Sequence, residues 1–236
     1  MTDLSLTLAI ADYDHTRDLV SGQMKPQGID LTSLIFDVEE TFFRFANAYE
    51  WQLSELSLAK FCSLRSLDEP PVVGIPVFIS RVFRHSAFYI RSDGKIKPSA
   101  DLKGGRIGVP EWTQTVTVYA RGWLHHEGGA KLDEVEWVQG GVNEPGRKEM
   151  GKGKLPEGIS YRTVADKSLT DMLLDGELDA VISARPPTVF LSGDGRLQRL
   201  MPNYREQELD YFERTGIYPI MHTLAIRRDV YEENRW

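Results

Sequence analysis

The stretch PVVGIPVFISRVFRHSAFYIRSD, residues 71–93, decides how the rest of the chain can be organised. It is rich in β-branched and aromatic residues, and turn-forming residues bound it on both sides, so it predicts one long strand. Arg81, Arg84 and His85 place three potential cations within five residues of this strand. In an extended chain Arg81 and His85 share one face, whereas Arg84 points to the other. Two interpretations remain open: an edge strand with solvated charges, or an anion-binding strand that crosses between two lobes.

The composition predicts a folded globular protein. The chain has 236 residues, of which 41% are hydrophobic and 27% charged, enough for one large domain or two small lobes. The net charge of −7 argues against a general nucleic-acid or anionic-membrane surface. The single cysteine, Cys62, excludes an intramolecular disulfide and a cysteine-based zinc site. Because Cys62 lies in an apolar segment, we expect a buried, inert thiol.

The compartment is inferred from what the N-terminal region lacks. It has no basic segment followed by a long apolar run, as a secretory signal would have. No apolar run reaches the roughly 20 residues of a membrane span. We therefore expect a cytoplasmic protein without a membrane partner.

The first part of the chain alternates strand and helix patterns. The expected strands are 4–10, 29–36 and 53–58. Asp37 and Glu40 form a capping-box pattern at the start of the intervening helix. This alternation implies parallel pairing with right-handed crossovers. His15, Glu55 and Ser57 follow or end such strands, at the usual ligand edge of an open α/β sheet.

A second α/β unit follows the long strand. Its expected strands are 106–109, 135–138 and 178–183. A helix should begin near Thr113, and Ser168 with Asp171 suggests another capping box. Residues 140–158, rich in Gly, Pro, Lys and Glu, are expected to form a long mobile loop. A strand at 220–227 then carries His222 near its start.

These patterns predict two lobes around a hinged cleft. The first lobe comprises residues 1–92 plus 219–236, and the second comprises residues 93–218. Two strands, rather than a flexible linker, would join them.

Several common chemistries are excluded by their motifs. The sequence has no Gly-rich phosphate loop and no Gly-x-Ser-x-Gly nucleophile elbow. His125 and His126 are adjacent, so on a helix their side chains point about 100° apart. They should interact with the helix dipole rather than hold a metal.

What remains is a set of polar groups at strand ends. Helix N–H groups near Thr113 favour a carboxylate or phosphate oxygen, and arginine can grip a carboxylate with two hydrogen bonds. Capping roles for the threonines and solvated charges for the arginines are the alternatives. The candidates are His15, Glu55, Ser57, Arg81, Arg84, His85, Glu111, Thr113, Gln114, Thr115, Arg185 and His222.

At these residues the chain resembles the 4,5-dihydroxyphthalate decarboxylase family, whose fold is similar to that of type II periplasmic solute-binding proteins. The matching strings span most of the chain, and RVFRHS and PIMHT are the more specific. The strings are ELSL (55–58), IPVF (75–78), RVFRHS (81–86), VPEWTQT (109–115), EWV (136–138), GG (140–141), EPGR (144–147), SARPP (183–187) and RTGIYPIMHT (214–223).

The resemblance implies an α/β fold of two lobes, each a mostly parallel sheet flanked by helices. It also implies further C-terminal helices completing the first lobe, and the sequence ends before them. The implied activity is non-oxidative decarboxylation of a dihydroxylated aromatic dicarboxylate, 4,5-dihydroxyphthalate, to protocatechuate. The implied partner is this small aromatic carboxylate. No organic cofactor is expected, and a divalent metal and a homo-oligomer stay open.

The hypothesis for catalysis is protonation of a ring carbon before CO₂ leaves. Histidine is the natural acid at neutral pH, so His85 or His222 would donate the proton and His15 or Glu55 would receive the phenolic one. Arg81, Arg84 and Arg185 with the Thr113 to Thr115 turn would hold carboxylate oxygens. Ser57, Glu111 and Gln114 complete the expected substrate-binding residues.

The alternative is a non-catalytic solute-binding or sensor protein for an aromatic carboxylate, which would need the same anchors. An enzyme of menaquinone or thiamine-precursor synthesis on this fold ranks lower, because the Arg-His string favours the decarboxylase family.

Overall fold

The computed structural model describes residues 3–149 and 155–236 and divides into two compact units. Unit 1 comprises residues 1–81 and 220–236, and unit 2 comprises residues 82–219. The boundary predicted from the sequence between the first and second lobes lies after residue 92. Residues 82–92 belong to unit 2 because a strand within them, β5 (Phe88–Arg91), pairs with β9 (Ala180–Ile182) and β10 (Leu197–Arg199) of the second sheet.

The prediction of a single long strand over residues 71–93 is wrong. The segment is divided into β4 (Val72–Arg81), a 3₁₀ turn (His85–Ala87) and β5 (Phe88–Arg91). β4 lies in the sheet of unit 1 and β5 in the sheet of unit 2. Arg81 and His85 therefore do not share a face of one strand.

Unit 1 is built on a five-stranded mixed sheet of order β2-β1-β3-β11-β4. β1, β2 and β3 pair in parallel, as the strand–helix alternation predicts. β11 lies between β3 and β4 and is antiparallel to both. Besides β4, the strands of this sheet are β1 (Leu4–Ile10), β2 (Ile29–Ile35), β3 (Leu53–Ser57) and β11 (Ile220–Arg227).

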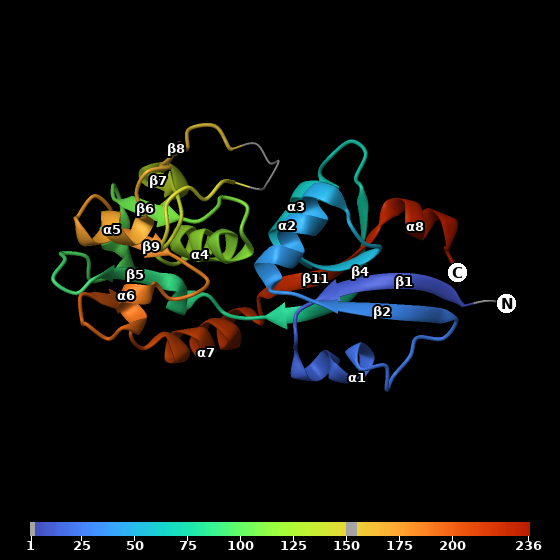
Figure 1. Cartoon of the computed structure of the whole chain (residues 1–236). Coiled ribbons are helices and arrows are strands. Elements are labelled where there is room, and N and C mark those ends of the chain that lie inside the picture. Colours follow the sequence, from blue (N-terminus) through green and yellow to red (C-terminus); the bar gives the residue numbers. More distant parts are fainter. Residues whose placement is uncertain (1–2, 150–154) are drawn as a thin grey trace. The chain divides into compact units, whose positions relative to one another are not determined.

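Helices cover both faces of this sheet (Figure 1). α2 buries Phe42 and Phe45 on one face, where α3 also packs, and α1 packs Leu19 and Val20 on the other. The predicted capping box is absent, because the Asp37 side chain makes no cap hydrogen bond. The helices are α1 (Arg17–Val20), α2 (Val38–Ala48), α3 (Leu58–Arg65) and α8 (Arg228–Glu233).

Unit 2 is built on a six-stranded mixed sheet of order β10-β5-β9-β6-β7-β8. The β6, β7, β8 and β9 pairings are parallel, whereas β5 pairs antiparallel with β9 and β10. Both units therefore have mixed sheets, parallel where strands alternate with helices. The bounds are β6 (Arg106–Val109), β7 (Glu136–Gln139), β8 (Ser160–Thr163), β9 (Ala180–Ile182) and β10 (Leu197–Arg199).

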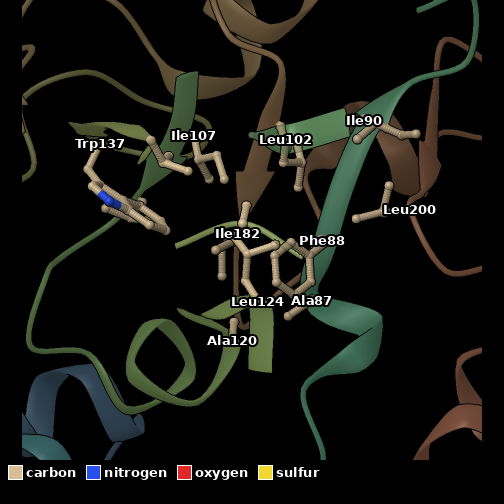
Figure 2. Packing of buried hydrophobic residues seen from close by; sticks show 14 of the residues in the cluster. Ala87, Phe88, Ile90, Leu102, Ile107, Ala120, Leu124, Trp137, Ile182 and Leu200 are labelled. Atoms are coloured by element: carbon tan, nitrogen blue, oxygen red, sulfur yellow. The ribbon is translucent and has the colours of Figure 1, made fainter. Parts of the chain in front are cut away.

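The helices of unit 2 pack against this sheet, and its core is closed by α4. Ala120 and Leu124 of α4 meet Phe88, Ile107 and Ile182 from three strands (Figure 2). The helices are α4 (Thr115–His126), α5 (Leu169–Leu174), α6 (Thr188–Leu191) and α7 (Tyr204–Thr215), with 3₁₀ turns at His85–Ala87, Ser99–Leu102 and Leu132–Glu134; the 3₁₀ turn Asp14–Thr16 belongs to unit 1.

Three local predictions can be compared with the structure. Ser168 caps α5, and its hydroxyl accepts a hydrogen bond from the Asp171 N–H at 3.0 Å, which is the Ser168 half of the predicted capping box. The prediction of a buried thiol is wrong, since Cys62 is exposed. Of the loop predicted for 140–158, residues 150–154 lie outside the described residues.

Among the described residues, no helix is both long and apolar enough to cross a membrane.

Leu102→Ala should destabilise the protein, because Leu102 is fully buried in the core of unit 2. Such a cavity lowers the free energy of unfolding by about 2–5 kcal/mol. The matched control is Leu191→Ala, at a side chain that is 67% exposed, where we expect a change within about 0.5 kcal/mol. Urea unfolding measures both, and equal losses would contradict the packing described.

Candidate functional site

A cluster of three side chains in unit 1 brings together segments far apart in the chain: Tyr13, Glu55 and His222. Glu55 lies in the middle of β3, and His222 lies near the start of β11. In the antiparallel register His222 stands opposite Ser57 and Leu224 stands opposite Glu55. Diagonal neighbours of this kind are within reach of long side chains. Tyr13 comes from the loop that follows β1.

Glu55 is the centre of this cluster. It is 0% exposed, and its Oε1 atom lies 2.6 Å from the Tyr13 hydroxyl and 2.6 Å from Nδ1 of His222. Its Oε2 atom accepts a hydrogen bond from the Ala11 N–H at 3.0 Å. Both carboxylate oxygens are therefore engaged within the chain.

The electrostatics of the cluster favour an ionised Glu55. Burial opposes ionisation, but the hydrogen bonds and charge of His222, with those from Tyr13 and Ala11, outweigh it and hold the pKa of Glu55 below its ordinary value. Burial and the hydrogen bond to Glu55 raise the pKa of Tyr13 far above its ordinary value. Tyr13 is consequently a neutral phenol at neutral pH.

This charge state defines the protonation of His222. An ionised carboxylate only accepts hydrogen bonds, so Nδ1 of His222 must carry a proton and donate it to Glu55. The remaining ring nitrogen, Nε2, has no hydrogen-bond partner among residues 3–149 and 155–236. The His222 side chain is 16% exposed. The ring of Phe42 packs edge-on against the imidazole, with the two ring centroids 4.8 Å apart. Nε2 is thus the atom through which His222 can exchange a proton.

His15, the other histidine predicted for unit 1, is differently placed. Its Nε2 atom is 3.1 Å from the carbonyl oxygen of Ile79, and its Nδ1 atom is 3.3 Å from an Asp14 carboxylate oxygen. Its ring stacks on Tyr13 at 5.2 Å. Both nitrogens face acceptors of the chain itself, so this histidine holds the loop after β1 against β4.

Ser57 and Arg81 stand at the ends of their strands. Ser57 is buried at the end of β3, paired in register with His222. Arg81 is the exposed last residue of β4, opposite Ile220 of β11. Glu55, Ser57 and His222 therefore gather at one place in unit 1, on the neighbouring strands β3 and β11.

In unit 2 the predicted anion-binding turn already holds a carboxylate. Glu149 accepts a hydrogen bond from the Trp112 N–H, from the Thr113 hydroxyl at 2.5 Å and from the Thr113 N–H at 3.4 Å. The Tyr161 hydroxyl lies 3.5 Å from the same carboxylate. Glu149 was not predicted because it lies in a loop without periodicity, where its negative charge is the only signal in the sequence.

The side chains around this turn are mostly buried, and most of them have hydrogen-bond partners. Glu111 is 1% exposed and accepts hydrogen bonds from Arg147 at 2.8 and 3.1 Å. Thr115 is the first residue of α4, and Gln114 is its cap residue, with a buried Oε1 atom that has no partner among the described residues. Arg121 was also missed: it donates to the Trp112 carbonyl at 2.8 Å.

The remaining predicted cations of unit 2 lie elsewhere in it. Arg84 and His85 line a cavity together with residues of α4 and α7. Burial lowers the pKa of Arg84 to about 10, so its guanidinium stays charged at neutral pH. Arg185 is exposed in the segment after β9. Within the described part of the chain, no group of three or more His, Cys, Asp or Glu side chains is arranged to hold a metal ion.

Comparison with known sequences gives two curated relatives. A 4,5-dihydroxyphthalate decarboxylase of Comamonas testosteroni is 38% identical over 237 residues, covering 100% of this chain and 72% of the relative. A 4,5-dihydroxyphthalate decarboxylase of Pseudomonas putida is 39% identical over 209 residues, covering 88% of this chain and 80% of the relative. No family model matches the chain.

Comparison with solved structures identifies the fold. The aliphatic sulphonate binding protein of Escherichia coli superposes with a TM-score of 0.54 at 13% identity, and 99% of this chain spans 64% of that protein. The alkanesulfonate-binding protein of Xanthomonas axonopodis pv. citri gives a TM-score of 0.51 at 11% identity, with 99% and 68% of the two chains covered. The predicted fold class, that of periplasmic solute-binding proteins, is confirmed.

Glu55→Gln should remove a pH-dependent contribution to stability. Because the folded-state pKa of Glu55 is lowered, the carboxylate stabilises the fold above its unfolded pKa of about 4.3 and loses this effect as pH falls through the folded pKa. The gap in unfolding free energy between wild type and Glu55→Gln should therefore be largest near neutral pH and shrink below about pH 4.

Urea unfolding at a series of pH values measures this gap. Glu157→Gln makes the same change of charge at an exposed position and serves as the control. A gap for Glu55→Gln that grows as pH falls would contradict the ionised, triply hydrogen-bonded carboxylate.

Proposed function

Because the chain belongs to the 4,5-dihydroxyphthalate decarboxylase family, we propose that it removes one carboxyl group of 4,5-dihydroxyphthalate as CO₂ and releases protocatechuate. The observation that carries the chemical part of this proposal is the Tyr13–Glu55–His222 cluster. It provides a histidine that is oriented by a buried carboxylate and keeps one ring nitrogen for proton exchange.

The reaction is a replacement of CO₂ by a proton. Direct loss of CO₂ would leave the bonding electrons on the ring carbon as an aryl carbanion of very high energy. The hydroxyl para to the departing carboxylate offers a lower path, because its oxygen donates electrons into the ring and lets the carbon accept a proton first. CO₂ then leaves, and its bonding electrons restore the aromatic ring. No electrons are gained or lost overall, so no oxidant or reductant is required.

His222 is the proton donor in this proposal. When doubly protonated, it can deliver the Nε2 proton to the ring carbon while Nδ1–H stays bonded to Glu55. The hydrogen bond to Glu55 fixes the orientation of the imidazole ring. A positioned general acid of this kind contributes about 100- to 10,000-fold to a rate.

Glu55 and Tyr13 act through His222 rather than on the substrate. Glu55 is completely buried and both its oxygens are occupied, which disfavours the alternative that it receives the phenolic proton. Tyr13 donates its hydroxyl to the same carboxylate oxygen. Both are therefore positioning residues.

The carboxylate that remains on the ring needs an anchor. Arg81, Arg84 and Arg185 stay candidates, because a guanidinium matches a carboxylate with two parallel hydrogen bonds. The Trp112–Thr113 turn is a second kind of candidate. It holds the carboxylate of Glu149, so its donors are of the right type, and a ligand would have to displace that side chain.

The alternative function is reversible binding of an aromatic carboxylate without chemistry. The fold is shared with binding proteins, and a receptor would use the same anchors. Recovery of the ligand distinguishes the two: a receptor returns 4,5-dihydroxyphthalate unchanged, and an enzyme returns CO₂ and a dihydroxybenzoate.

His222→Asn should lower kcat for 4,5-dihydroxyphthalate by about 100- to 10,000-fold with a much smaller change in KM, because the loss falls on proton transfer. The assay follows release of CO₂ or of dihydroxybenzoate by the purified protein. His125→Ala, at an exposed histidine of α4, is the control and should keep wild-type turnover.

Two results would count against this assignment. If the wild type binds 4,5-dihydroxyphthalate and releases it unchanged, the protein is a receptor. If His222→Asn and wild type turn over equally, another group donates the proton, and His85→Asn becomes the variant to measure.

A further inference from the structure

Unit 2 contains a cavity of about 450 Å³ that the proposed proton transfer by His222 does not use. Side chains of α4 and α7 form its walls, including Tyr119, Trp123 and Tyr211, and Ile217 and Pro219 close it from the segment after α7. Sites for small molecules typically measure about 300–1,000 Å³ and are lined mainly by apolar and aromatic side chains. All residues of this cavity belong to unit 2.

A buried polar ring lies at the wall of this cavity. His85 is 6% exposed and packs edge-on against Trp123 and Tyr211, each with ring centroids 5.4 Å apart. Its Nδ1 atom has no hydrogen-bond partner among the described residues. The Glu208 carboxylate oxygen is 4.0 Å away, beyond hydrogen-bond distance. Buried polar groups without a partner are rare in folded proteins, so a ligand in the cavity would account for this one.

Gly122 is the second observation, and it is independent of His85. It lies in the middle of α4 and lines the cavity. A Cβ atom added there would meet no described atom within 4 Å, and its φ is not in the left-handed region. Glycine weakens a helix interior relative to alanine. Neither the backbone nor the packing of the described residues requires glycine here, but its missing side chain leaves the cavity open.

Arg84 supplies a positive charge at the wall, and the carboxylate of Glu208 also acts on this guanidinium. Arg84 lines the cavity and is charged at neutral pH, since burial lowers its pKa only to about 10. Glu127 also lines the cavity, but Arg214 pairs with its carboxylate at 2.9 Å. Aromatic walls accommodate a ring edge-on or stacked, and a guanidinium pairs with a carboxylate.

We propose that this cavity is a binding site for a single-ring aromatic carboxylate. The ring lies among Tyr119, Trp123 and Tyr211, the carboxylate faces Arg84, and His85 hydrogen-bonds a polar group of the ligand. The choice of ligand class rests on the proposed function. The site itself is argued from residues 82–219 alone.

The experiment uses the whole chain and 4-hydroxybenzoate, a probe with one ring and one carboxylate, in calorimetric titration. Gly122→Leu fills the open space and should weaken binding at least about 10-fold, while the melting temperature stays equal or rises because leucine favours the helix. Gly122→Ala is the matched control: it makes the same gain in helix preference with little filling, and should bind within about 3-fold of wild type. His85→Phe keeps the ring and removes its nitrogens, and should also weaken binding.

The outcomes separate this site from the proposed decarboxylation. His222→Asn should bind the probe as wild type does, whatever its turnover. The proposal is overturned if wild type fails to bind 4-hydroxybenzoate at millimolar concentration, or if folded Gly122→Leu binds it as tightly as wild type. It is also overturned if 4-hydroxybenzamide, which lacks the charge, binds as well as the acid.

Discussion

The buried carboxylate of Glu55 is the interaction on which the organisation of unit 1 depends. A charge removed from water is strongly unfavourable unless hydrogen bonds and an opposite charge compensate it. Here the compensation comes from Ala11, Tyr13 and His222. These donors belong to the loop after β1 and to β11, which is separated from β3 by all of unit 2 along the chain. The carboxylate thereby fixes the register at which the returning strand β11 enters the sheet.

Much of the fold was predictable because it follows from local pattern. The alternation of apolar residues in 4–10 and the buried run of 106–109 correspond to β1 and β6. The prediction of one strand over residues 71–93 was wrong for a physical reason. Apolar, β-branched character indicates an extended chain but not the sheet in which each part pairs, and the turn at His85–Ala87 contains no glycine or proline that would mark a break.

The candidate site was predictable to a similar degree. Glu55 and His222 were identified as polar groups at expected strand ends; Glu55 instead lies in the middle of β3, and the structure places the two side chains in contact. Tyr13 and Glu149 were missed. Each makes its decisive contact with a residue at least 36 positions away in the chain, and neither lies in a periodic segment. Position along a strand is encoded locally, whereas the partner of a loop side chain is decided by tertiary structure.

A structural role alone does not account for the Tyr13–Glu55–His222 cluster. A pair that served only to join β3 and β11 could be apolar, since well-packed hydrophobic residues often stabilise a fold as well as a buried ion pair does. His15 differs, because both its ring nitrogens face oxygen atoms of the chain, those of Ile79 and Asp14. His222 instead commits Nδ1 to a carboxylate and leaves Nε2 without a partner in the described part of the chain. That asymmetry fits the proton transfer proposed for His222.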